Sequence, residues 1–284
     1  MRFFFLFITA LASGFSLAPV LAAPKGPIKA PSKTQLLWTI ASTHTGRETL
    51  RKATLKWKYE RIEQIATRIE WAQVSRTDAV VVRKFDPISG AEIRERQVKI
   101  YLNQDQPELG MVLDLAHELT HAINDPDWDP YDPKLSRGRY IQAALEGSGG
   151  EIEAIENECR VAVALKGKFD AKAIFDRCGA YLSSDQISRD LIKKDIYRIG
   201  KWKRPLEKTL GVDLKLFPAL SGDAPVLYSS TGNAPYPVAL AREYQNLNRI
   251  ACKNTIRRLQ ASGRKPAGDY SHVDEFVKQR CVDF

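Results

Sequence analysis

The chain has 284 residues, of which 44% are hydrophobic and 27% are charged, and its formal net charge is +9. This composition excludes an intrinsically disordered protein, and the length suits one large domain or two small ones. The basic residues are spread along the chain and are not gathered into a nucleic-acid-binding motif. We therefore expect solvated basic faces and no nucleic-acid partner.

The N-terminus has the order of a secretory signal peptide. Arg2 is followed by an uncharged apolar run from Phe3 to Leu21, and small residues then precede Pro24. We expect residues 1–22 to be a signal peptide and the protein to be exported, to the periplasm or out of the cell. An uncleaved membrane anchor is the alternative, because the run is nearly long enough to span a bilayer. We expect no membrane span after signal removal.

The next part of the chain predicts a lead-in, a helix and two strands. Residues 23–46 are expected to be a lead-in segment, because they begin with a Pro-, Lys- and Ala-rich stretch. Leucine and isoleucine recur at helical spacing between Arg47 and Ala72, which predicts one long helix. The segments Ala79–Val82 and Val98–Leu102, joined across a Pro- and Gly-containing turn, predict two strands of a small sheet.

Most of the remaining chain has helical signals. Pro107 opens an amphipathic helix that Pro126 prevents from continuing much beyond Asn124. A glycine-rich break at 147–150 precedes a helix from about Glu151 to Lys166, and further helices are expected at 184–199 and 237–261. The fold class predicted is α+β, mainly helical, with a small antiparallel sheet beside the helix that follows Pro107.

Four cysteines follow the expected signal peptide: Cys159, Cys178, Cys252 and Cys281. None belongs to a CxxC pair, and an even number in an exported chain predicts two disulfide bonds. Our prediction pairs nearest neighbours, the first cysteine with the second and the third with the fourth. Thiolate ligation of a metal is the alternative, but it needs closer spacing in a reducing compartment.

The segment His117-Glu118-Leu119-Thr120-His121 is an HExxH motif. Helix positions four apart lie one above the other, so both imidazoles can reach one Zn²⁺ while Glu118 lies beside its open coordination position. Zinc lowers the pKa of a bound water to about 7, and Glu118 is the candidate general base for that water. The chain has only 4 histidines, so two of them in this arrangement disfavour a chance match.

With this motif the sequence resembles the zincin zinc metallopeptidases over about Ala79 to Gly167. The resemblance implies a hydrolase that cleaves peptide bonds in a protein or peptide substrate, with Zn²⁺ as cofactor. It makes 47–170 the catalytic region and leaves 171–284 as a helical C-terminal region. In zincins an edge strand precedes the motif helix and binds extended substrate, and Val98–Asn103 is the corresponding segment here.

The resemblance leaves the third zinc ligand open among three residues. Gluzincin-like enzymes take a glutamate from a second helix in an ExxA pattern, which favours Glu151. Metzincin-like enzymes extend the motif to HExxHxxGxxD, which places Asp127 at the ligand position, although Asn124 replaces the glycine and no methionine follows the motif. Glu156 remains a rival, because it lies between apolar residues of the second helix.

Other residues are candidates for supporting roles. Asp114, one turn before His117, could orient an imidazole or be an ordinary exposed helix residue. The residue that stabilises the transition state is either none of the tyrosines and histidines outside the motif or one of four candidates: Tyr131, Tyr140, Tyr228 and His272. The acidic loop at 125–132 is expected at the rim of the site. The competing hypothesis is a non-catalytic exported binding or scaffold protein of the cell envelope, in which the HExxH motif is structural or degenerate.

Overall fold

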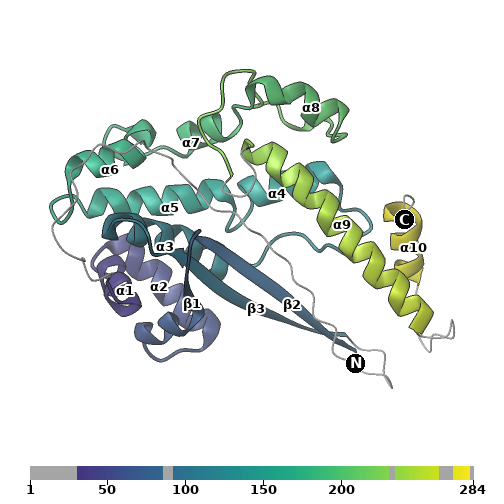
Figure 1. Ribbon diagram of the computed structural model, residues 1–284, viewed down its shortest axis with the longest axis horizontal. Coiled ribbons are helices and arrows are strands. Elements are labelled where there is room, and N and C mark those ends of the chain that lie inside the picture. Colours follow the sequence, from purple (N-terminus) through teal and green to yellow (C-terminus); the bar gives the residue numbers. More distant parts are fainter. Residues whose placement is uncertain (1–30, 86–91, 230–233, 262–270, 282–284) are drawn as a thin grey trace.

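The computed structural model describes residues 31–85, 92–229, 234–261 and 271–281. The fold is α+β and mainly helical, as the sequence predicts. Helix α3 (Glu108–Ile123) lies at the centre, between a small sheet on one side and helix α5 (Glu151–Ala164) on the other (Figure 1). The expected signal peptide lies outside the described residues.

The main sheet contains strands β1 (Ile69–Ala72), β2 (Arg76–Phe85) and β3 (Glu92–Asn103) in the order β1-β3-β2. Strands β2 and β3 are antiparallel, as predicted, but β1 pairs with β3 in parallel. The segment Val98–Asn103 is therefore in the central strand, with both of its edges paired. The prediction of this segment as the substrate-binding edge strand is wrong, and β2 is the edge strand beside α3.

The predicted long helix from Arg47 to Ala72 is also wrong. Helix α2 (His44–Trp57) ends at Lys58, whose φ of 56° is left-handed and stops the helix. A 3-10 helix (Ile62–Arg68) follows, and the last residues of the segment form β1. The apolar spacing came from residues of three separate elements: Ile62, Ile65 and Ile69 pack in the core, whereas Leu55 of α2 exposes 66% of its surface.

A helix that the sequence interpretation missed occupies part of the expected lead-in at 23–46. Helix α1 (Lys33–Ala41) has Ser32 as its N-cap and a reciprocal capping box with Gln35. It buries three apolar side chains against the core, Leu36, Leu37 and Ile40. The S-x-x-Q capping signal was present in the sequence, and it marks the start of α1 at Lys33.

Both ends of α3 have clear causes. Pro107 is the N-cap, and Asn124 at the C-cap already has extended backbone. Arg96 on β3 donates hydrogen bonds to the last carbonyl groups of α3 and to the Asn124 carbonyl. These bonds satisfy acceptors that the helix itself leaves unpaired, and they place a positive charge at the negative end of the helix dipole. Strand β3 therefore fixes the end of α3 that carries the motif.

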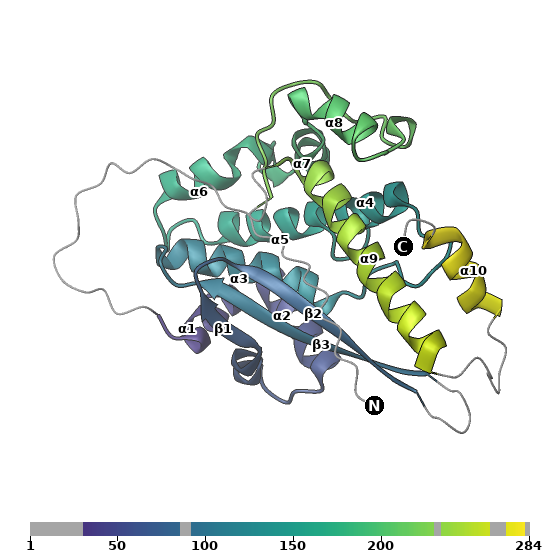
Figure 2. The same cartoon turned by 45° about the vertical axis from the view of Figure 1, so that its right-hand side comes forward.

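The other elements surround α3 and α5 (Figures 1 and 2). They are α4 (Arg137–Glu146), α6 (Ala171–Cys178), β4 (Leu182–Ser183), β5 (Gln186–Ile187), α7 (Arg189–Ile196), α8 (Lys203–Lys208), α9 (Tyr236–Ala261) and α10 (Ser271–Arg280). The helix predicted at 184–199 is shortened to α7 by the β4–β5 hairpin, whereas α9 matches its prediction closely. One hydrophobic core includes residues from both sides of position 170, so the two predicted regions pack together.

Both predicted disulfide bonds are present, Cys159–Cys178 between α5 and the end of α6, and Cys252–Cys281 between α9 and the chain after α10. They bear out the nearest-neighbour pairing. Disulfides of this kind are typical of proteins that reside in oxidising compartments. Among the helices that the structure describes, none is both long and apolar enough to cross a membrane.

Candidate metal centre

Two imidazoles from α3 and one carboxylate from α5 converge in the interior of the protein. His117 and His121 lie one turn apart on α3, and Glu151 is the first residue of α5. The side chains of His117 and Glu151 are completely buried, and that of His121 exposes only 12% of its surface. These three residues form a group whose ligand atoms could hold one metal ion.

A glycine turn brings the start of α5 to the end of α3. Gly149 has a φ of 67°, and a Cβ atom at this position would come within 2.4 Å of the Asn124 Cβ. Only glycine fits both the left-handed backbone and this close approach. The Gly149 carbonyl in turn accepts a hydrogen bond from His121 Nδ1 at 2.7 Å. The turn therefore delivers Glu151 to the imidazoles and also orients one of them.

The distances between the ligand atoms match one tetrahedral ion. The two Nε2 atoms are 3.1 Å apart, and the Glu151 oxygens lie 3.1 Å from His121 Nε2 and 3.5 Å from His117 Nε2. Ligands bound to tetrahedral zinc at about 2.0–2.1 Å stand roughly 3.3 Å from one another. A zinc ion therefore fits between these atoms with little movement of the side chains.

The hydrogen bonds on the far side of each ring set its tautomer. His117 Nδ1 lies 3.0 Å from a Glu158 oxygen, and His121 Nδ1 faces a carbonyl that can only accept. Both Nδ1 atoms therefore donate, which leaves a lone pair on each Nε2. Two nitrogen lone pairs and a carboxylate converge on one point, and neither Glu151 oxygen accepts a hydrogen bond of normal geometry. This set of donors is one that could hold a metal ion.

The pKa values of the clustered side chains show that positive charge is favourable between them. Burial lowers the pKa of His117, but hydrogen bonds and charge from Glu151 and Glu158 outweigh burial and raise that pKa well above its ordinary value. Burial raises the pKa of Glu151, but the charges and hydrogen bonds of the two histidines more than offset it and hold the value at about 2. The cluster therefore stabilises positive charge between its ligand atoms, whether protons or a metal ion supply it.

Glu118 lies beside the ligands in a buried position. One oxygen of its carboxylate, Oε2, is buried and has no hydrogen-bond partner among the described residues. Burial raises the pKa of this carboxyl to about 7, although the charges of the two motif histidines and a hydrogen bond from Thr77 oppose the rise. A buried carboxylate oxygen that nothing else occupies is free to accept a proton from a small molecule beside it.

The other two candidates for the third ligand do not reach the imidazoles. Asp127 is exposed in the loop after α3. Glu156 forms ion pairs with Arg160 and Arg189 near the protein surface. Of the three residues left open by the sequence, the structure brings only Glu151 to the two histidines.

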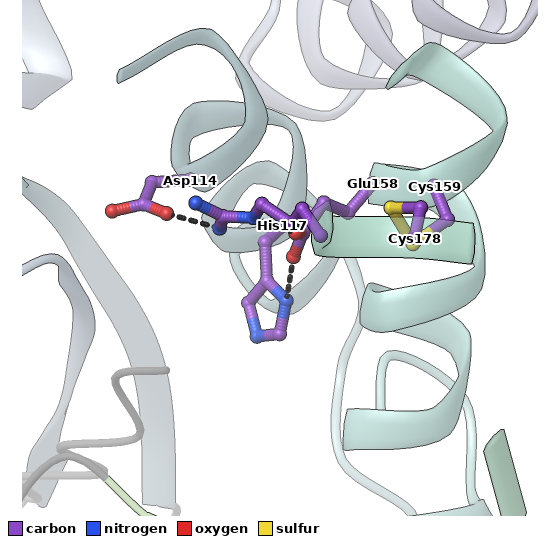
Figure 3. Close-up of a disulfide and its surroundings, with 6 residues drawn as sticks. Asp114, His117, Glu158, Cys159 and Cys178 are labelled. Atoms are coloured by element: carbon purple, nitrogen blue, oxygen red, sulfur yellow. Dashed lines mark hydrogen bonds and ion pairs between the residues drawn. A yellow bond between two sulfur atoms is a disulfide. The ribbon is translucent and has the colours of Figure 1, made fainter. Parts of the chain in front are cut away.

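The residue that orients His117 is Glu158 and not Asp114. Glu158 lies on the same face of α5 as Glu151, two turns further along, and it contacts the His117 ring (Figure 3). Asp114 is buried, but it binds the Arg177 guanidinium together with Ser75 and Gln106. Neither alternative that the sequence left open for Asp114 holds, because its carboxylate is buried and its hydrogen bonds go to Arg177, Ser75 and Gln106 and not to an imidazole. Its influence on His117 is indirect, because Arg177 also binds Glu158.

A cavity of about 150 Å³ lies next to the cluster and is lined by His121 and the Gly149–Gly150 turn. Its other walls come from β2, β3, the loop after α3, α4 and the turn after α4: Thr77, Ala79, Val81, Arg96, Asn124, Pro126, Trp128, Pro130, Tyr140, Ala143, Ala144 and Ser148. The walls are mainly apolar. The acidic loop therefore contributes its proline and tryptophan side chains to the cavity rather than its carboxylates.

A buried tyrosine that interacts with Glu151 was not among the sequence candidates. Tyr236, at the start of α9, is buried, and its hydroxyl makes no hydrogen bond of normal geometry with a described residue. Burial first, and then the charge of Glu151, raise its pKa well above the ordinary value. Tyr140 lines the cavity, whereas Tyr228 exposes 42% of its surface and is not among the lining residues.

The last two candidates are Tyr131 and His272. Tyr131 packs against Phe276 of α10. The side chain of His272 lies outside the described residues. A second group of possible metal ligands, Glu158 with Cys159 and Cys178, contains a disulfide and so offers no thiolate.

Comparisons of this chain with models of protein families, with curated proteins and with solved structures found no match. No relative therefore supplies a function. The functional conclusion depends on the chemistry of the residues that converge between α3 and α5.

Proposed function

We propose that the protein is an exported zinc-dependent peptidase with a gluzincin-like site. The observation that supports it is the convergence of two Nε2 lone pairs and the Glu151 carboxylate on one point, beside the buried carboxylate of Glu118. His117, His121 and Glu151 are the proposed metal ligands. Zinc at this position supplies a Lewis acid that polarises a carbonyl group and makes water a better nucleophile.

Glu118 is the proposed general base. Its free oxygen takes a proton from the attacking water and returns that proton to the nitrogen of the leaving amine. Gly149 and Glu158 hold the two imidazole rings through their Nδ1 atoms, so that each ring keeps its lone pair on Nε2. Tyr236 is the proposed donor to the carbonyl oxygen as negative charge develops on it.

The cavity beside His121 is the proposed position of a substrate side chain. A cavity of about 150 Å³ with apolar walls is large enough for a benzene-sized group. Its β2 wall belongs to an edge strand of the sheet in the described residues, and an edge strand can pair with an extended peptide. This combination favours a peptide substrate with a large apolar residue next to the cleaved bond.

Two measurements on the mature protein test the proposal. Elemental analysis is expected to find one zinc per chain, and Glu118→Gln is expected to retain that zinc while peptide hydrolysis falls by about 100-fold or more. Glu108→Gln is the matched control, because Glu108 is an exposed residue of the same helix. Undiminished hydrolysis by Glu118→Gln would contradict the mechanism. Stoichiometric zinc without any hydrolysis would favour the binding or scaffold protein instead.

A further inference from the structure

The Cys159–Cys178 disulfide lies next to an ion pair in the chain. Each cysteine directly follows one of the two charged residues of that pair. Glu158 precedes Cys159 on α5, and Arg177 precedes Cys178 at the end of α6. The Arg177 Nε atom donates to one Glu158 oxygen, and the other Glu158 oxygen faces His117 Nδ1 at 3.0 Å. The disulfide and this charged pair therefore join the same two helices at adjacent positions (Figure 3).

Arg177 is the shared partner of two buried carboxylates. Its Nη2 atom donates to Oδ1 of Asp114 on α3. The other Asp114 oxygen, Oδ2, accepts hydrogen bonds from Ser75 and Gln106. A continuous series of contacts thus runs from Asp114 through Arg177 and Glu158 to His117. Removal of the guanidinium would leave two buried carboxylates without their countercharge, and Glu158 would lose the contact that fixes its direction.

Little else holds α6 in place. Of its residues, Ala171–Cys178, only Ile174 and Cys178 are buried, and Phe175 exposes 65% of its surface. A short helix with so few buried apolar contacts is expected to open locally at a low free energy. The disulfide restrains the end of α6 that carries Arg177, at the position where this residue reaches Glu158.

We propose that the Cys159–Cys178 disulfide makes Arg177 a positioning residue for the metal ligand His117, so that full metal affinity arises only after the two thiols are oxidised. This inference rests on the proposed zinc site. Oxidation forms the S–S bond and transfers two electrons and two protons to a disulfide-type oxidant, which becomes a dithiol. The reduced chain keeps the three ligands but holds Glu158 less firmly, and it binds metal more weakly.

This arrangement couples metal loading to the compartment in which the chain resides. In a reducing compartment the two thiols persist, whereas an oxidising compartment forms the bond and completes the site. The protein would therefore become a competent metalloenzyme after export. Glu158 and Arg177 are placed to transmit this change because each is the chain neighbour of one bonded cysteine.

The two disulfides provide a matched comparison. Cys159→Ala/Cys178→Ala is expected to bind zinc about 10- to 100-fold more weakly than the wild type in competition with a chelator. Cys252→Ala/Cys281→Ala is expected to keep wild-type affinity, because this bond lies in the separate C-terminal cluster. The closed loops span 19 and 29 residues, so the chain-entropy model gives similar stability losses and slightly favours a larger one for the control.

Arg177→Met keeps both disulfides and tests the positioning role separately, which matters if the first cysteine variant does not fold. It is expected to weaken zinc binding by a similar factor and to change the visible absorption of the Co²⁺-substituted protein, a readout that loss of stability alone does not move. Circular dichroism establishes that each variant is folded.

Three results would overturn the inference. One is wild-type zinc affinity in both the Cys159→Ala/Cys178→Ala and Arg177→Met proteins, and another is equal weakening by the two disulfide variants. The third is a wild-type protein that binds no zinc, which would remove the proposed function as well. Zinc binding with the predicted ranking but no peptide hydrolysis would support the inference and reject only the proposed peptidase activity.

Discussion

Replacement of Glu151 by glutamine tests the metal centre most directly. The change keeps the shape of the side chain but removes the charge of the only carboxylate that reaches both Nε2 atoms in the described structure. Because the Glu151 side chain is completely buried, the loss of its charge is only weakly screened by solvent. We therefore expect a loss of zinc affinity close to the full contribution of one ligand.

The size of this loss follows from the number of ligands. Structural zinc sites with four protein ligands bind with about 10–16 kcal/mol, or roughly 2.5–4 kcal/mol for each ligand. Loss of one ligand therefore raises the dissociation constant by roughly 60- to 700-fold. The buried position of Glu151 favours the upper part of this range, whereas the remaining amide oxygen of glutamine favours the lower part.

Chelator competition at fixed pH measures the dissociation constant of each protein. Glu156→Gln is the matched control, since Glu156 lies on the same helix but pairs with Arg160 and Arg189. Removal of these partly exposed ion pairs is expected to change stability by about 1 kcal/mol or less and to leave zinc affinity unchanged. Tight zinc binding by Glu151→Gln together with zinc loss by Asp127→Asn would refute the assignment and favour a metzincin-like ligand set.

Two further predictions concern the substrate side of the site. Tyr236→Phe is expected to lower kcat by about 100-fold at unchanged zinc affinity, because it removes a donor to the developing oxyanion; an unchanged kcat in steady-state assays would exclude that role. Ala144→Trp fills the cavity beside His121 and is expected to raise KM for peptides with a large apolar side chain while sparing peptides with alanine there. Equal changes in KM for both peptide series would show that the substrate side chain does not bind in this cavity.

The sequence predicts the motif helix well because its determinants are local. Pro107 opens α3, the apolar residues follow a helical period, and Pro126 follows its end, so no distant residue is needed to define it. Four cysteines allow three connectivities, and the nearest-neighbour pairing that we favoured among them is the one in the structure. Strand β1 could not be predicted in this way. It forms by parallel pairing with β3, about thirty residues further along the chain.

The supporting residues of the site could not be predicted either, because they come from segments that are far apart in the sequence. Arg177 reaches Asp114 across 63 positions of the sequence, and Tyr236 arrives from the start of α9. No periodic pattern relates residues that meet only through tertiary packing. Glu158 is different, because it shares a helix face with Glu151, and that spacing was visible before the structure.

The spacing of Glu151 and Glu158 becomes meaningful only when α5 is placed in register with α3. Asn157 sets this register, since its amide donates to the Ala116 carbonyl and to the Thr120 hydroxyl on α3. Its own oxygen accepts a hydrogen bond from Thr49 of α2, so three helices meet at one side chain. With α5 fixed at this height, one glutamate faces the Nε2 side of the imidazoles and the other faces Nδ1 of His117. One helix–helix contact therefore supplies both the third ligand and the carboxylate that orients the first.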